Sequence, residues 1–189
     1  VSPAYLAARS QLIDPLTSHG PARAGEPDGV QLSAWGRDQS PELPSTSHLV
    51  AFDRQGNAAS MTSSVEDAFG SRIMVRGFLL NNQLTDFSFR PDDQGVPVAN
   101  RVAPGKRPRS AMSPTLVLDD QGKVQMAVGS PGGSLIIHYV ARSLLALTEW
   151  QLDPQAVVNL PHYGSRNGPT ELEAERGLEA LAEAAAELA

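Results

Sequence analysis

Thr46 occupies a position at which a break in the chain would create a catalyst. It lies in Pro44-Ser45-Thr46-Ser47-His48, where a proline-rich stretch gives way to an alternating apolar one. If the peptide bond before Thr46 breaks, the threonine gains a free α-amine that can accept the proton of its own hydroxyl. The β-propensity of threonine at the start of a strand is the competing explanation. Its position alone therefore makes Thr46 a candidate nucleophile and no more.

A glycine-rich turn offers a second chemical group. The segment Gly129-Ser130-Pro131-Gly132-Gly133-Ser134 precedes a strongly apolar stretch with helical spacing. The first N–H groups of a helix have no acceptor within it and can stabilise a developing negative charge. Crowding at a helix start explains the same two glycines, and the lysine of a phosphate-binding loop is missing. The residues alone leave both interpretations open.

Histidines and cations give weaker signals. His48 follows Thr46 by two residues, so on a strand both side chains lie on one face, although structural histidines are commoner than catalytic ones. His19, His138 and His162 lack the spacing of a metal site, and we predict neither a metal nor a cofactor. One basic cluster is either a solvated loop or the frame of an anionic substrate: Arg101, Lys106, Arg107 and Arg109.

The composition limits the classes of protein. With 189 residues, 41% hydrophobic and 19% charged, the chain is expected to form one globular domain with appendages. A net charge of −6 argues against a nucleic-acid partner. The absence of cysteine excludes disulfides and thiolate chemistry. We see no apolar run of about 20 residues and no leader before Val1, so we expect no membrane span and a chain cut from a longer one.

The patterns around these groups predict mixed helices and antiparallel strands. A helix capped by Ser2-Pro3 is expected within residues 1–13, followed by a proline- and glycine-rich linker over residues 14–45. Two hairpins and the sheet they form are expected from strands at 48–52 with 58–64 and at 115–118 with 124–128. Further elements are predicted as central strands at 73–75 and 78–80, a loop at 81–83, and helices at 135–147, 153–158 and 170–189, with the apolar stripe of the first buried against a sheet.

Eight short motifs in one order resemble those of the γ-glutamyltranspeptidase family. They are Thr46-Ser47-His48, Asp53-Arg54-Gln55-Gly56-Asn57-Ala58, Phe69-Gly70-Ser71, Gly77-Phe78-Leu79-Leu80-Asn81-Asn82-Gln83, Asp86-Phe87-Ser88, Gly105-Lys106-Arg107-Pro108, Ser110-Ala111-Met112-Ser113-Pro114-Thr115 and Gly129-Ser130-Pro131-Gly132-Gly133-Ser134. The likeness is strong over residues 46–134 and weaker to about residue 173.

The resemblance implies an N-terminal-nucleophile (Ntn) hydrolase with an α+β fold, part of an αββα sandwich of antiparallel sheets and flanking helices. Residues 1–45 would be the end of a large subunit and residues 46–189 most of a small, catalytic one that is truncated at its C-terminus. The remainder of the large subunit is the expected partner, in a heterodimer formed when the chain cuts itself before Thr46. The family is typically periplasmic or secreted.

The implied activity is cleavage of γ-glutamyl amides such as glutathione through a threonyl acyl-enzyme, which passes its acyl group to water or to an amino acid. Thr46 matches the nucleophile, and Ser64 matches the hydroxyl residue that hydrogen-bonds it. Gln83 and Asp86 match the residues that bind the substrate α-amino group. The remaining matches are Ser110, at the substrate α-carboxylate, and the oxyanion glycines Gly132 and Gly133.

Two positions depart from the commonest pattern of the family. Glu66, within the substrate-binding set, stands where many members have asparagine, and Ala111 stands where many have a second serine. A carboxylate there would repel the substrate's own α-carboxylate unless it is protonated or turned to a cation. The departures favour one alternative, a cephalosporin (glutaryl) acylase of the same fold. The other alternative is an unprocessed, inactive fragment.

Overall fold

The computed structural model describes residues 1–17, 20–40, 46–173 and 178. The chain divides into two compact units, one made of residues 1–37, 92–99 and 161–189 and the other of residues 38–91 and 100–160. It contains both helices and antiparallel strand pairs, which confirms the predicted mixed class. Within the described residues, no helix is both long and apolar enough to cross a membrane.

Two hairpins of the second unit follow the prediction closely. Strands β1 (Ser47–Phe52) and β2 (Ala58–Ser63) pair over their whole length, and β7 (Thr115–Leu118) pairs with β8 (Val124–Val128). The first turn is closed by Asp53, whose carboxylate accepts the Asn57 N–H at 2.8 Å. Asp119 does the same for the Lys123 N–H at 2.9 Å. Local turn chemistry therefore fixes both registers.

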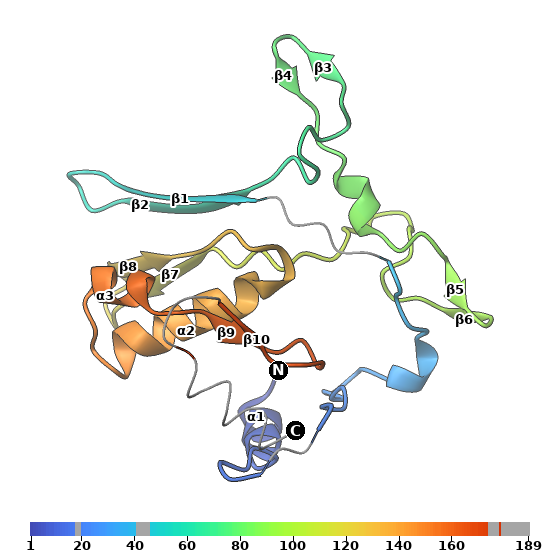
Figure 1. The fold of residues 1–189 in the computed structure, drawn as a ribbon, viewed down its shortest axis with the longest axis horizontal. Coiled ribbons are helices and arrows are strands. Elements are labelled where there is room, and N and C mark those ends of the chain that lie inside the picture. Colours follow the sequence, from blue (N-terminus) through green and yellow to red (C-terminus); the bar gives the residue numbers. More distant parts are fainter. Residues whose placement is uncertain (18–19, 41–45, 174–177, 179–189) are drawn as a thin grey trace. The chain divides into compact units, whose positions relative to one another are not determined.

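Helix α2 (Ile136–Thr148) of the second unit packs against β8, and helix α3 (Pro154–Asn159) packs against α2. Helix α2 begins after a short 3-10 turn, η3 (Gly133–Leu135), and runs alongside β8 (Figure 1). Ile136, Val140 and Ala146 are buried. The expected burial of the whole apolar stripe is wrong at two positions, because Ile137 and Leu145 stay about half exposed. Helix α3 is capped by Asp153, as predicted.

The strands predicted at 73–75 and 78–80 are present, but the prediction that they are central strands of a sheet is wrong. Strands β3 (Met74–Val75) and β4 (Phe78–Leu79) form a short hairpin in which Met74 is 66% and Phe78 is 60% exposed. The apolar run has the composition of a buried strand, but its large side chains stay exposed on this hairpin. The hairpins also remain separate two-stranded pairs instead of joining in one sheet. The expected loop at 81–83 leads into a 3-10 turn, η2 (Gln83–Asp86).

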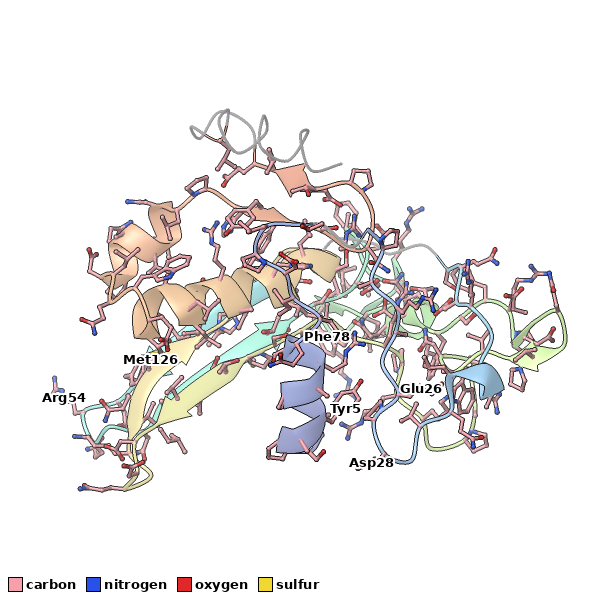
Figure 2. The ribbon with its side chains drawn as sticks, turned by 90° about the horizontal axis from the view of Figure 1, so that it is seen from below. Tyr5, Glu26, Asp28, Arg54, Phe78 and Met126 are labelled. Atoms are coloured by element: carbon pink, nitrogen blue, oxygen red, sulfur yellow. The ribbon has the colours of Figure 1, made fainter. Side chains whose placement is uncertain are left out.

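The first unit holds helix α1 (Pro3–Ser10), whose N-cap is the Ser2 side chain, as predicted. The phenol of Tyr5 projects from this helix and lies against Gly25, where an added Cβ would overlap its oxygen (Figure 2). The linker contains a 3-10 turn, η1 (Leu32–Ala34), and Gly36, which bridges to Val98 beside the hairpin of β5 (Asp92–Asp93) and β6 (Val96–Pro97).

The predicted helix over residues 170–189 is wrong at its start. Glu171 and Leu172 form strand β10 (Glu171–Leu172), which pairs with β9 (Tyr163–Gly164). Thr170 precedes this strand without helical structure, and most of the remaining predicted helix lies outside the described residues. The turn between the strands includes Asn167, whose φ of 69° suits an asparagine.

Candidate active site

The β1–β2 hairpin places Thr46 and Ser64 at one end of the same strand pair. In its register Ser47 lies opposite Ser63 and His48 lies opposite Thr62. The same register continued by one residue sets Thr46 opposite Ser64, and opposed residues in an antiparallel pair present their side chains on one face. Both residues are half-buried. Thr46 and Ser64, 18 positions apart in the chain, thus each lie one residue beyond the paired strands at the same end of the hairpin.

A second cluster joins two carboxylates through one amide. The Gln83 side-chain Nε2 donates to Glu66 Oε2 at 2.9 Å and also donates to Asp86 Oδ2. Gln83 and Asp86 lie at the two ends of η2, and Glu66 follows β2 by three residues. The structure therefore brings together three of the substrate-binding residues expected from the sequence.

Glu66 is unusual in both its backbone and its side chain. Only 6% of it is exposed, and its φ of 77° lies in the left-handed region, where asparagine is tolerated better than glutamate. Burial, then a hydrogen bond from Glu66 to Asp86 and the Asp86 charge, raise the pKa of Glu66 to about 6. A non-glycine residue held in this conformation at a buried charged position is typical of a functional site.

The structure adds a network that the sequence did not indicate. Arg109 Nη1 lies 3.4 Å from Asp38 Oδ2, and Asn100 Nδ2 donates to the same oxygen at 2.8 Å. Arg109 Nη2 also donates to the Ser40 carbonyl at 3.3 Å. Burial acts to raise the pKa of Asp38, but hydrogen bonds from Asn100 and from the Ser40 N–H and hydroxyl, together with the Arg109 charge, hold it below its ordinary value. Arg109 therefore binds Asp38 and Ser40, which precede Thr46 in the chain.

Ser110 follows Arg109 directly but makes a different contact. Its hydroxyl accepts the Met112 N–H at 3.2 Å, and no hydrogen bond between described residues joins it to Glu66, Gln83 or Asp86. Ser110 is exposed. Ser110 therefore follows Arg109 in the chain but lies outside the hydrogen-bonded cluster of Glu66, Gln83 and Asp86.

The glycine turn lies between β8 and α2. Gly132 has φ 136° and Gly133 has φ 57°, conformations that side chains other than glycine adopt rarely. A Cβ at Gly132 would also come within 2.5 Å of the Tyr139 ring. The Gly132 carbonyl accepts the Leu135 N–H at 3.1 Å, while the N–H groups of both glycines precede the helix and have no acceptor within it. This geometry suits stabilisation of an oxyanion.

Comparison with known proteins places these features in a family. The pattern of the gamma-glutamyltranspeptidase family matches residues 1–189. The chain is 38% identical over 167 residues to the glutathione hydrolase proenzyme of Bacillus subtilis (strain 168), covering 84% of this chain and 27% of the relative. It is 39% identical to the glutathione hydrolase proenzyme of Escherichia coli (strain K12), covering 72% of this chain and 24% of the relative.

A solved structure gives the same result for the fold. The crystal structure of a Helicobacter pylori gamma-glutamyltranspeptidase mutant superposes with a TM-score of 0.64 at 32% identity, covering 75% of this chain and 80% of that chain. The Ntn-hydrolase fold expected from the motifs is therefore confirmed. The chain spans about a quarter of the length of the two curated relatives. With its whole length matched, the chain belongs to the gamma-glutamyltranspeptidase family.

Proposed function

We propose that this chain carries the nucleophile of a self-cleaving amidohydrolase and transferase that acts on γ-glutamyl amides such as glutathione. The observation that carries the substrate class is the pair of carboxylates, Glu66 and Asp86, bridged by the Gln83 amide. In this proposal Thr46 is the nucleophile, and the other site residues position the substrate or stabilise charge around it.

The carboxylate pair is suited to an ammonium group. The α-amine of a γ-glutamyl substrate is protonated at neutral pH, and charge-assisted hydrogen bonds to carboxylates are the strong ones. In the structure the Gln83 amide donates to both carboxylates, as an ammonium group would. A glutaryl group has no amine, so it would leave the two carboxylates without an ammonium partner. This favours a γ-glutamyl substrate over the glutaryl substrate of an acylase.

The first chemical step is the cut before Thr46. The Thr46 hydroxyl attacks the carbonyl carbon of Ser45, the C–O bond forms as the C–N bond breaks, and the hydroxyl proton passes to the leaving nitrogen. Water then hydrolyses the ester, leaving a carboxylate on Ser45 and a free amine on Thr46. Ser64, which the register continued by one residue sets opposite Thr46, is the proposed hydrogen-bond partner of the attacking hydroxyl. The proenzyme names of the two relatives support such a processing step.

The second step uses the freed amine as a base for the Thr46 hydroxyl. The hydroxyl attacks the γ-glutamyl amide, and the Gly132 and Gly133 N–H groups stabilise the oxyanion, each contributing about 3 kcal/mol by analogy with measured donors. Ser110, beside Arg109, holds the substrate α-carboxylate. The acyl-threonine then passes its acyl group to water or to an amino acid, and the Thr46 hydroxyl is restored.

The remainder of a large subunit completes the enzyme in this proposal. Residues 1–45 form its end, residues 46–189 belong to the small subunit, and the two stay together as a heterodimer. Large exposed apolar side chains support the proposal that a partner subunit covers part of this surface. They include Leu49, Val50, Phe52, Phe69, Met74 and Phe78.

Expression of the full-length protein with and without Thr46→Ala tests the proposal. The native protein should appear as two bands on a denaturing gel, with threonine as the new N-terminus, and should hydrolyse γ-glutamyl-p-nitroanilide faster than glutaryl-p-nitroanilide. Thr46→Ala should remain one inactive band. A native protein that stays uncut would support the inactive alternative, and a preference for the glutaryl amide would support the acylase.

A further inference from the structure

His48 touches both strands of its hairpin and the loop that leads to the glycine turn. Its Nδ1 lies 2.9 Å from Thr62 Oγ1, the residue opposite it in the register. Its Nε2 lies 3.5 Å from Ser60 Oγ, which donates to the Val128 carbonyl at 3.3 Å. The imidazole is therefore held at both nitrogens, and one of its partners is bound to the end of β8.

The next residue after β8, Gly129, fits directly against this imidazole. A Cβ built on Gly129 would overlap the Nδ1, Cε1 and Nε2 atoms of His48. Gly129 is not among the residues with positive φ, so its backbone does not require glycine. The reason for a glycine at this position is the space taken by the histidine ring.

We propose that His48 is a positioning residue that sets the separation between the nucleophile and the oxyanion donors, an inference that rests on the proposed function. Thr46 lies one residue before β1 and two before His48, a span of about 6.6 Å in extended chain. Gly132 follows Gly129 by three residues. The two catalytic groups come from elements more than 80 residues apart in the chain, so a non-covalent contact must set their separation.

The contact between His48 and Gly129 is suited to setting this separation. The imidazole ring packs against Gly129, and its two nitrogens lie within hydrogen-bond distance of hydroxyl groups on β2. A displacement of about 1 Å between reacting groups costs about 10²-fold in rate. In the amide cleavage His48 needs no proton-transfer role, since the freed Thr46 α-amine serves as the base. The self-cleavage and the amide cleavage use the same nucleophile, so both depend on the same separation.

A double-mutant cycle in the full-length protein tests the inference. His48→Ala should lower kcat for γ-glutamyl-p-nitroanilide by about 10²-fold with KM changed less than about threefold, and should slow the self-cleavage. Gly129→Ala should be as damaging alone. In the His48→Ala background the added methyl group enters the space left by the ring, so Gly129→Ala should cost much less there. Gln55→Ala, in the turn of the same hairpin, is the matched control.

A milder variant covers the case in which the alanine proteins fail to fold. His48→Asn keeps a polar group within reach of Thr62 and should retain more of kcat than His48→Ala, with the shape of the pH profile unchanged. Loss of one limb of that profile would assign proton transfer to His48 and overturn the positioning role. Additive costs in the double mutant, or an unchanged kcat in His48→Ala, would also overturn it. A native protein that neither cuts itself nor cleaves the substrate would instead contradict the proposed function.

Discussion

At the scale of single residues, both the backbone and the side chain of Glu66 are held in unfavourable environments. It combines a left-handed backbone, burial and a hydrogen-bonded contact with a second acid through Gln83. The φ of 77° gives a physical reason why asparagine is common there, because asparagine is among the non-glycine residues that adopt it most readily. A glutamate retained against this preference indicates a use for its carboxyl group.

The raised pKa of Glu66 predicts a pH-dependent stability. Between the ordinary pKa of 4.5 and the folded pKa of about 6, the folded chain holds a proton that the unfolded chain has released. The free energy of unfolding therefore falls as pH rises through this window and levels off above it, by at most about 2 kcal/mol. Glu66→Gln stays neutral and should not show this fall.

Urea unfolding of the full-length protein at pH 4.5 and 7.5 measures the difference. The Thr46→Ala background keeps the chain as one species, so that unfolding involves a single covalent chain. The free energy of unfolding of the Glu66→Gln variant, minus that of the protein with Glu66, should be larger at pH 7.5 than at pH 4.5. An equal change in the free energy of unfolding between the two pH values for both proteins would show that Glu66 titrates as an ordinary glutamate.

Ala111 is the other residue at which the site departs from the family pattern. It is half-buried next to Ser110, where many family members have a second serine for the substrate α-carboxylate. Ala111→Ser restores this hydroxyl and should lower KM for γ-glutamyl-p-nitroanilide by about tenfold, the effect of one net hydrogen bond. Steady-state kinetics measure it, with Ala99→Ser as the control. A KM that stays the same would mean that position 111 does not face the α-carboxylate.

At the scale of elements, the cap of α3 gives a prediction that is independent of catalysis. The Asp153 carboxylate accepts the N–H groups of Gln155 and Ala156, both at 3.0 Å. Asp153→Ala leaves these donors without the cap and should lower the free energy of unfolding by about 1 kcal/mol. Asp153→Asn keeps an accepting oxygen and should cost much less. If thermal unfolding shows the two variants equally destabilised, the negative charge and not the cap is what stabilises the helix.

Local signals explain which elements the sequence predicted. The β1–β2 and β7–β8 hairpins were predictable because Asp53 and Asp119 begin turns whose hydrogen bonds span four residues or fewer. The exposure of Met74 could not be predicted, because an apolar run does not reveal whether another element covers it. The carboxylate cluster was predicted from the resemblance to the family and not from a local pattern. The Asp38–Arg109 pair was missed because it joins residues 71 positions apart that no local pattern connects.

At the scale of the whole molecule, the Asp38–Arg109 pair bears on what happens to the chain after the cut. Asp38 and Ser40 precede the proposed cleavage site and are bound by residues that follow it. Arg109 and Asn100 hold the Asp38 carboxylate, and the Ser40 hydroxyl accepts the Phe89 N–H at 3.1 Å. These contacts do not involve the bond that is cut. They should therefore keep the end of the large subunit attached to the small one.

Asp38→Ala should release this attachment. Charge-assisted hydrogen bonds contribute about 1.5–3 kcal/mol, so the loss should speed amide hydrogen exchange in residues 36–40 of the processed protein by about tenfold or more. Asp28→Ala removes an exposed carboxylate from the same stretch and should leave this exchange unchanged. Hydrogen exchange read by mass spectrometry measures both. Equal exchange in the native protein and in Asp38→Ala would mean that the segment leaves Arg109 once the chain is cut, and that other surfaces hold the two subunits together.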